Sequence, residues 1–218
     1  MANTTLDTSS IYSSHSWFNV MLAVLYSLVV LTGLIGNSLV IAIVCKTRSM
    51  FTTTNILLAN VATADLISLL WCPIPLAVDL SGKHTSGIAG HYICKFFTGY
   101  AVTSVTVGVT YLSLVVLALE RYYAVVKPFK PALVPTNQRM YHVIGGIWIA
   151  AIIFSLPGFI FSEYDKQSGR CLDPWTLEKA ARLKWIFVLL AVSSSFFSGC
   201  LFFCYFQILK GIYVNHTV

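Results

Sequence analysis

The chain has 218 residues, of which 57% are hydrophobic and 10% are charged. Ordinary soluble domains are about a quarter charged, so this composition excludes a disordered chain and disfavours a soluble globular domain. The formal net charge is +6, but the basic residues form no stripe on which nucleic acid would bind; they lie between long apolar spans.

Five apolar spans predict an all-α membrane protein. Each is longer than the roughly 18 residues that identify a membrane-spanning helix, and at a rise of about 1.5 Å per residue it would cross a hydrocarbon core about 30 Å thick. The apolar runs are continuous rather than alternating, which favours helices over a β-barrel. The predicted helices are 17–45, 54–78, 96–119, 143–162 and 185–209, between an amino-terminal tail, 1–16, and a carboxyl-terminal end, 210–218.

The basic residues and the cysteines indicate how the spans are oriented. Lysines and arginines divide equally between the two faces, but Lys46 and Arg48 follow the first span, whereas the tail before it has no basic residue. The positive-inside rule then places the amino terminus outside. Cys94 and Cys171 lie in loops on that same face, where a disulfide would persist in the oxidising exterior. Asn3 begins an acceptor sequence for N-glycosylation there, and we expect a cytoplasmic carboxyl terminus.

The spans contain one charged residue, Asp65 in the second. An ionised carboxylate near the middle of a membrane helix costs at least about 2.5–3.5 kcal/mol, so Asp65 should face the interior of the bundle. It is then either a structural hydrogen-bond node or a site for an ion or a proton, with Asn37 and Thr110 as candidate neighbours. The sequence has no phosphate-binding glycine loop, metal-binding histidine spacing or nucleophile elbow, and we expect no enzyme.

The third span ends on an acid beside a base, in the sequence LERYYAVVKP. An arginine at a helix end commonly anchors the helix at the membrane surface, and Glu120 would then only offset the charge of Arg121. Alternatively, because Pro128 soon ends the segment, the pair lies on the last cytosolic turn, where a guanidinium can hold one partner and exchange it for another. The residues alone leave both interpretations open.

Motifs in all five spans follow one another in a recognisable order. They are GLIGNSLV with Asn37, TTTNILLANVATADL with Asp65, ALERYYAVVKP with Arg121, WIAAIIFSLP with Trp148, and CYFQILKGIY with Tyr205. Together they resemble the first five helices of a rhodopsin-like (class A) G-protein-coupled receptor. The resemblance implies the five-helix portion of a seven-transmembrane helix bundle, in the plasma membrane.

The resemblance also implies roles for the end of the third helix. Glu120 would restrain Arg121, and Arg121 would act as the switch that meets a heterotrimeric G protein. Tyr122 to Pro128 would form part of the coupling loop.

Further residues match positions of known function in the family. Asp65 matches the sodium-site aspartate, with Asn37 and Thr110 as its partners. A sodium ion is therefore the implied allosteric ligand, and no other cofactor is expected. Cys94 and Cys171 match the disulfide that joins the third helix to the second extracellular loop.

Two departures from the family concern the contact between the third and fifth helices. Phe197 stands where the family has a proline, eight residues before Tyr205. Tyr111 stands where a smaller aliphatic residue is usual. Because these positions pack together as the family's activation connector, the connector of this chain is either rebuilt or impaired.

Two more departures concern chain length. The segment from Cys94 to Arg121 is about two residues longer than usual, which would rotate Cys94 by roughly 200° on a regular helix; we therefore expect an earlier loop or a bulge near Gly99. The sequence ends at Val218, before the family's sixth and seventh helices, so we expect that this chain alone would not signal.

The absence of an acid in the third span limits the chemical class of ligand that we expect. Thr103 stands where aminergic receptors have an amine-binding acid, and no acid lies between 96 and 119, which disfavours a biogenic amine. The long charged loop after the fourth span favours a peptide. The leading hypothesis is a receptor for a neuropeptide-like peptide. The alternative is a truncated, non-signalling five-helix membrane protein that associates with and modulates a full-length receptor. A transporter or channel would need more polar groups within the membrane.

Overall fold

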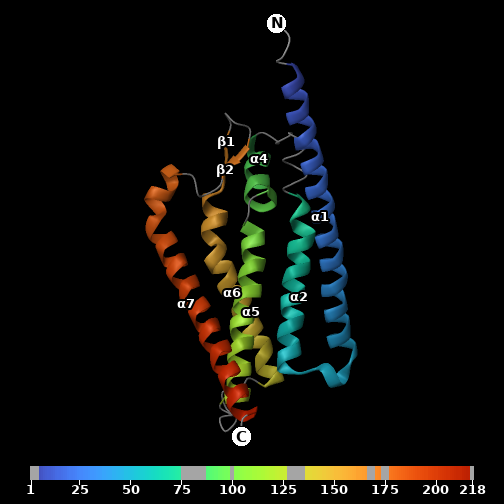
Figure 1. The fold of residues 1–218 in the computed structure, drawn as a ribbon. Coiled ribbons are helices and arrows are strands. Elements are labelled where there is room, and N and C mark those ends of the chain that lie inside the picture. Colours follow the sequence, from blue (N-terminus) through green and yellow to red (C-terminus); the bar gives the residue numbers. More distant parts are fainter. Residues whose placement is uncertain are drawn as a thin grey trace.

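The computed structural model describes residues 5–74, 87–98, 101–126, 136–165, 170–172 and 177–216. Five long helices run beside one another between opposite ends at which the two chain termini lie (Figure 1). All five are long and apolar enough to cross a membrane, as the sequence predicts. Their bounds are α1, Thr5–Lys46; α2, Thr53–Trp71; α5, Ala101–Val126; α6, Asn137–Phe161; and α7, Leu177–His216.

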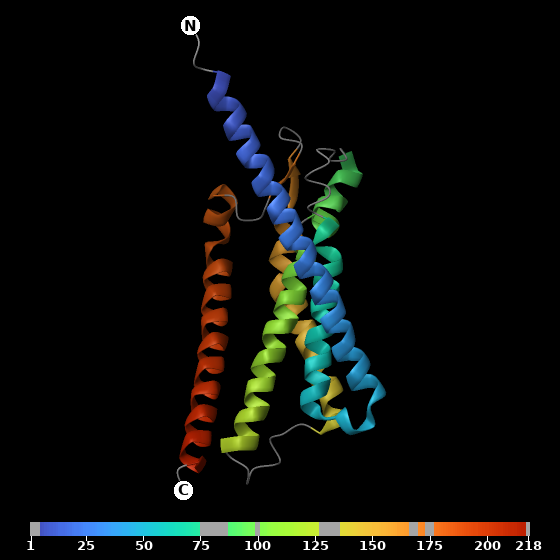
Figure 2. The same cartoon turned by 45° about the vertical axis from the view of Figure 1, so that its right-hand side comes forward.

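The first helix begins earlier than the sequence predicts. α1 starts at Thr5, although its apolar membrane-spanning stretch starts only at Val20. Residues 5–16 of the predicted tail are therefore helical, whereas the membrane-spanning stretch starts close to the predicted position 17. Residues 1–4, with Asn3, lie outside the described residues. Once a helix has formed, each added residue gains a hydrogen bond without a new nucleation cost, so α1 continues into polar sequence and extends past its neighbours (Figure 2).

The second helix, α2, is interrupted at Cys72, and residues 73–74 are again helical. Its start is capped by Thr52, whose hydroxyl accepts a hydrogen bond from the Asn55 backbone N–H at 3.3 Å. It ends at Trp71, ahead of Pro73, because proline has no N–H to donate and its ring clashes with the preceding turn. The predicted end at 78 falls among residues 75–86, outside the described residues.

The third predicted helix, α5, continues through the acid–base pair instead of ending at 119. It is preceded by the short helix α4, Gly87–Ile93, and by a π-helix, η2, Cys94–Thr98. A π-helix takes more residues per turn than an α-helix, so η2 accommodates the extra residues that the sequence assigns to a bulge near Gly99. Gly99 itself is outside the described residues.

The remaining helices also extend past their apolar runs. α6 begins at Asn137 rather than 143, and α7 covers Leu177–His216 rather than 185–209. Hydropathy identifies only the part of a helix that lies in lipid. The backbone hydrogen bonds continue into the polar sequence on either side.

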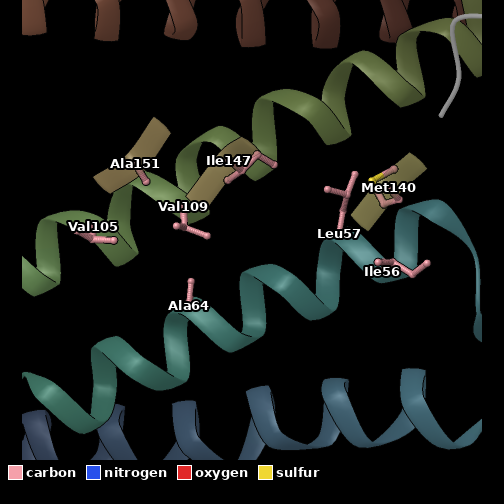
Figure 3. Packing of buried hydrophobic residues seen from close by; sticks show 8 residues of the cluster. All are labelled: Ile56, Leu57, Ala64, Val105, Val109, Met140, Ile147 and Ala151. Carbon is pink, nitrogen blue, oxygen red and sulfur yellow. The ribbon is translucent and has the colours of Figure 1, made fainter. Parts of the chain in front are cut away.

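The core of the bundle lies where α5 packs against α2 and α6. Gly108 allows close approach there, because a Cβ atom added to it would lie 3.3 Å from the Cβ of Ala151 on α6. α1 packs on α2, and α7 packs on α5. The buried apolar residues of the core cluster are Ile56, Leu57, Ala64, Val105, Val109, Met140, Ile147 and Ala151 (Figure 3).

A β-hairpin covers the end of the bundle nearest the amino terminus (Figure 1). Its strands are β1, Glu163–Asp165, and β2, Arg170–Leu172, with Tyr164 opposite Cys171. Cys171 forms a disulfide with Cys94, with the two Cα atoms 5.5 Å apart. The predicted disulfide is therefore present, and it ties the hairpin to η2, the π-helix that precedes α5.

Candidate functional site

The candidate site lies at the far end of α5 from the hairpin, around Glu120. This side chain is 8% exposed, and its Oε1 atom accepts a hydrogen bond from the Thr54 hydroxyl at 2.9 Å. The Thr53 hydroxyl donates to the same oxygen. The second oxygen, Oε2, is buried without a hydrogen-bond partner in the described part of the chain. The carboxylate is thus held on one side by the first turn of α2 and has unused acceptor capacity on the other.

Arg121 is exposed and contacts the same threonine. Its Nη2 atom donates to the Thr54 hydroxyl oxygen at 2.8 Å. Within the described residues, Glu120 and Arg121 form no ion pair with each other, so any restraint of Arg121 by Glu120 would be indirect. Consecutive residues on a helix point in different directions. The Thr54 hydroxyl connects the two by donating to Glu120 and accepting from Arg121.

The neighbouring aromatic residue links this end of α5 to α7. The ring centroid of Tyr122 lies 6.1 Å from that of Phe203 on α7 and 5.4 Å from that of Tyr123. Close by, Gly211 of α7 faces the side chain of Val126, so the two helices converge at the end where the carboxyl terminus lies. Pro128, the last residue predicted for this site, lies outside the described residues.

Two of the three residues predicted for an ion site are in contact. The Thr110 hydroxyl donates to Asp65 Oδ1 at 2.9 Å, which joins α5 to α2. The side-chain N–H of Asn37 instead donates to the Gly33 carbonyl of its own helix at 2.9 Å. Two oxygen-bearing side chains therefore meet between α2 and α5, and oxygen is the donor that hard cations prefer.

A second polar contact deep in the bundle was only partly anticipated. Asn60 donates to the Ser113 hydroxyl at 2.9 Å and accepts from the Trp148 indole N–H at 2.9 Å. Asn60 and Trp148 belong to the motifs seen in the sequence, whereas Ser113 does not. In the sequence, Ser113 could have been recognised as a polar residue within an apolar helix. These hydrogen bonds join α2, α5 and α6, and we interpret their role as structural.

The predicted connector between α5 and α7 takes a rebuilt form. The Tyr111 hydroxyl donates to the Ser194 carbonyl at 3.0 Å and lies 2.5 Å from the Ser198 hydroxyl. Its ring meets Phe197 edge-on, with centroids 6.4 Å apart. Tyr205 is 47% exposed, and none of the described hydrogen bonds reaches it. The tyrosine that departs from the family pattern therefore makes the contact, together with two serines that the sequence did not indicate.

Comparison with known proteins places the chain among membrane receptors. The family described as 7 transmembrane receptor (rhodopsin family) matches residues 36–217. The chain is 30% identical over 172 residues to the pyroglutamylated RF-amide peptide receptor of Mus musculus, with 75% of this chain and 39% of that receptor covered.

Two further relatives give the same picture. Identity to the cholecystokinin receptor type A of Homo sapiens is 34% over 151 residues, 69% of this chain and 34% of that receptor. Identity to chemokine XC receptor 1 of Homo sapiens is 29% over 209 residues, 94% of this chain and 58% of that receptor. The chain therefore spans less than two thirds of the length of these relatives.

Proposed function

The chain belongs to the rhodopsin family of seven-transmembrane receptors, and on this premise we propose that it forms the part of a plasma-membrane receptor that binds an extracellular peptide and couples to a heterotrimeric G protein. The observation that carries the proposal is the contact of Glu120 and Arg121 with Thr54. An exposed arginine held by a neutral hydroxyl beside a buried acid is suited to exchange that partner for another protein.

Peptide recognition is supported by the relatives and by the opposite end of the bundle. The names of the RF-amide and cholecystokinin relatives point to peptide ligands. In this chain, a disulfide fixes the hairpin that contains Cys171 against η2, the π-helix that precedes α5. A loop held in this way presents a preformed surface, which reduces the ordering cost of binding a flexible peptide.

The same disulfide supports the orientation. Disulfides persist in oxidising compartments, and the Cys94–Cys171 bond lies at the end of the bundle where the amino terminus lies (Figure 1). With that end outside the cell, Glu120 and Arg121 face the cytosol. The arginine would then be accessible to a cytosolic partner.

The switch would work by transferring Arg121 from Thr54 to the G protein. Hydrogen bonds to charged groups contribute about 1.5–3 kcal/mol net, and less when the group is exposed, so the bond to Thr54 favours the resting position of Arg121 and can still be exchanged. A partner that offers backbone carbonyl or carboxylate oxygens can replace one such bond. When Arg121 leaves, Thr54 still donates to Glu120, so the acid remains paired.

We also propose that Asp65 and Thr110 bind a sodium ion. Their oxygen atoms already lie together inside the bundle, and the carboxylate supplies the negative charge that a monovalent cation needs in a low-dielectric site.

One observation supports the alternative, in which the chain is a non-signalling protein that associates with a full-length receptor and modulates it. α7 exposes large apolar side chains along its length, on which a helix of another receptor could pack. They include Trp185, Leu189, Phe196, Phe202 and Leu209. Co-purification of this chain with an intact receptor, in the absence of any signal of its own, would favour that role.

The coupling role is tested with the chain completed by the segment of the mouse RF-amide relative that follows the matched region. Arg121→Ala should abolish peptide-stimulated G-protein activation, measured with dissociation sensors at matched surface expression. Arg48→Ala is the matched control, because Arg48 is also exposed but lies in the short 3₁₀ helix after α1. Equal activation by the two variants would contradict the proposal.

A further inference from the structure

Two cysteines lie four residues apart in α7, inside its membrane-spanning stretch Lys184–Ile212. Cys200 and Cys204 are both free thiols, and their side chains interact with each other. Neither residue belongs to the site around Glu120 or to the contact of Asp65. They form a separate pair of sulfur ligands on one face of the helix.

The two thiols differ in accessibility. Cys204 is only 2% exposed, whereas its chain neighbours Phe203 and Tyr205 are exposed, so the Cys204 side chain points into the bundle, where α7 packs on α5. Cys200 is partly exposed. A single buried cysteine in an apolar helix is explained by packing, but packing does not require a second thiol in contact with the first. The pair has one sulfur in the interior and one that an ion can reach.

The spacing of the pair suits a bridging ion better than a disulfide. Residues four apart on a helix have Cβ atoms about 5–6 Å apart, whereas a disulfide needs a Cβ separation of about 3.5–4.5 Å. An ion bound to both sulfurs adds two metal–sulfur bonds, each about 2.3 Å long in zinc sites, and can therefore span the larger separation. Since α7 is one continuous helix here, the two thiols are arranged to chelate an ion.

The number of available ligands decides which metal fits. Thiolate sulfur is a soft ligand that selects soft ions such as Cu(I), and it also binds zinc. Zinc sites have three or four protein ligands, but the described residues contain no group of three or more His, Cys, Asp or Glu side chains that could hold a metal ion. Cu(I) has a filled d shell and a single positive charge, and two sulfur ligands satisfy it.

We propose that Cys200 and Cys204 form a two-coordinate Cu(I) site within the membrane. On binding, one thiol loses its proton to water and becomes a thiolate, and the other thiol binds through a sulfur lone pair. The charge of the thiolate cancels that of Cu(I), so the complex is neutral. A neutral complex suits this position, because an isolated charge is costly in a low-dielectric interior.

The depth of the pair agrees with supply of the ion from the cytosol. Eight residues separate Cys204 from Ile212, the end of the spanning stretch, which is about 12 Å at a rise of about 1.5 Å per residue. This step rests on the proposed orientation, in which that end faces the cytosol. The cytosol keeps thiols reduced, and copper in a reducing compartment is Cu(I).

The test uses the intact 218-residue chain in nanodiscs, with Cys45→Ser and Cys72→Ser so that the pair provides the remaining free thiols. Cu(I) is added anaerobically as its acetonitrile complex, without a reductant that would open the disulfide, and bicinchoninate competes for it. This parent chain should retain one Cu(I), and X-ray absorption should show two sulfur atoms bound to copper. Cys200→Ala and Cys204→Ala should each bind Cu(I) at least about a hundredfold more weakly, because two linked ligands exceed one by about 10²–10⁴-fold.

A matched variant separates the geometry of the site from the number of thiols. Cys200→Ala combined with Phe202→Cys keeps two thiols in α7 but places them two residues apart, where side chains do not face each other. Phe202 is exposed, so the packed interior is unchanged. This displaced-thiol variant should bind Cu(I) as weakly as Cys200→Ala. Formation of the disulfide verifies the fold of every variant, and if Cys204→Ala fails that check, the displaced-thiol variant decides the question.

Three results would overturn the proposal. They are Cu(I) affinity of the displaced-thiol variant equal to that of the parent chain, displacement of Cu(I) by an equimolar amount of Zn²⁺, and nitrogen or oxygen atoms in place of the two sulfurs in the X-ray absorption spectrum. None of these measurements depends on a peptide or a G protein, so the copper site and the proposed receptor function are tested separately.

Discussion

The hydroxyl of Thr54, in the first turn of α2, donates a hydrogen bond of 2.9 Å to the buried carboxylate of Glu120 on α5. The same hydroxyl oxygen accepts a bond of 2.8 Å from Arg121. One neutral side chain therefore connects the acid and the base that stand next to each other in the sequence. The resting position of the Arg121 side chain therefore depends on a residue of α2 as well as on its own helix, α5.

Replacing Thr54 with valine tests this dependence. Thr54→Val keeps the shape of the side chain but loses both bonds, so Arg121 should be released and basal G-protein activation in the completed receptor should rise several-fold. Hydrogen bonds to charged groups contribute about 1.5–3 kcal/mol, which is sufficient for such a shift. Thr63→Val on the same helix removes a hydroxyl that donates only to its own helix, at Ala59, and should change nothing. Identical basal activity of the two variants would count against the connection.

The sodium site is tested by salt dependence. Agonist affinity of the completed receptor should fall when sodium replaces N-methylglucamine, and Asp65→Asn should remove that effect. Thr110→Val should weaken it, because the Thr110 hydroxyl lies 2.9 Å from the carboxylate. Asn37→Ala should leave it nearly intact, since Asn37 bonds within α1. A loss of sodium sensitivity in Asn37→Ala as large as that in Asp65→Asn would show that the site is built differently.

The close approach of α5 and α6 is tested at glycine positions. Gly108→Val places new atoms against Ala151, where an added Cβ alone would lie 3.3 Å from the Ala151 Cβ. Overpacking of this kind costs about 1–3 kcal/mol, so surface expression and thermal stability in detergent should fall. Gly146→Val on α6 has nothing within 4 Å of the added Cβ and serves as the control. Equal stability of the two variants would contradict the packing.

The rebuilt connector is tested by removing one oxygen atom. Tyr111→Phe loses the bonds to Ser194 and Ser198 but keeps the ring against Phe197. At about 0.5–1.5 kcal/mol for each hydrogen bond, the bundle should be measurably less stable to heat in detergent. Tyr205→Phe removes a hydroxyl from an exposed residue and should have no effect. If both variants unfold at the same temperature as the unmodified chain, the Tyr111 hydroxyl does not stabilise the contact with α7.

Much of the fold follows from the sequence, because continuous apolar runs of this length form helices wherever lipid is the solvent. The positions of the helix ends cannot be predicted in this way, because hydropathy does not report the backbone hydrogen bonds that continue into polar sequence. α1 therefore starts at Thr5 rather than at 17. The hairpin was missed as well, because three-residue strands with Tyr164 opposite Cys171 give too short a pattern to recognise.

For the site, the sequence indicates the residue types but not their contacts. The meeting of Asp65 with Thr110 was anticipated from the residues and from the resemblance, as was the disulfide. The place of Thr54 between Glu120 and Arg121 was not, because it depends on how α2 is rotated against α5. The hydrogen bond that Asn37 makes was not anticipated either, because a side chain within one turn of a helix can bond to its own backbone instead of across the bundle.

The central claim is tested most directly by a double-mutant cycle on Thr54 and Glu120 in the completed receptor. Basal G-protein activation is measured for Thr54→Val, Glu120→Gln and the double variant at equal surface expression. If the two residues restrain Arg121 as a unit, each single variant raises basal activity and the double variant is no more active than the stronger single one. If the effects of the two substitutions multiply, or if Glu120→Gln leaves basal activity unchanged across several G proteins, Thr54 and Glu120 do not act together on the arginine.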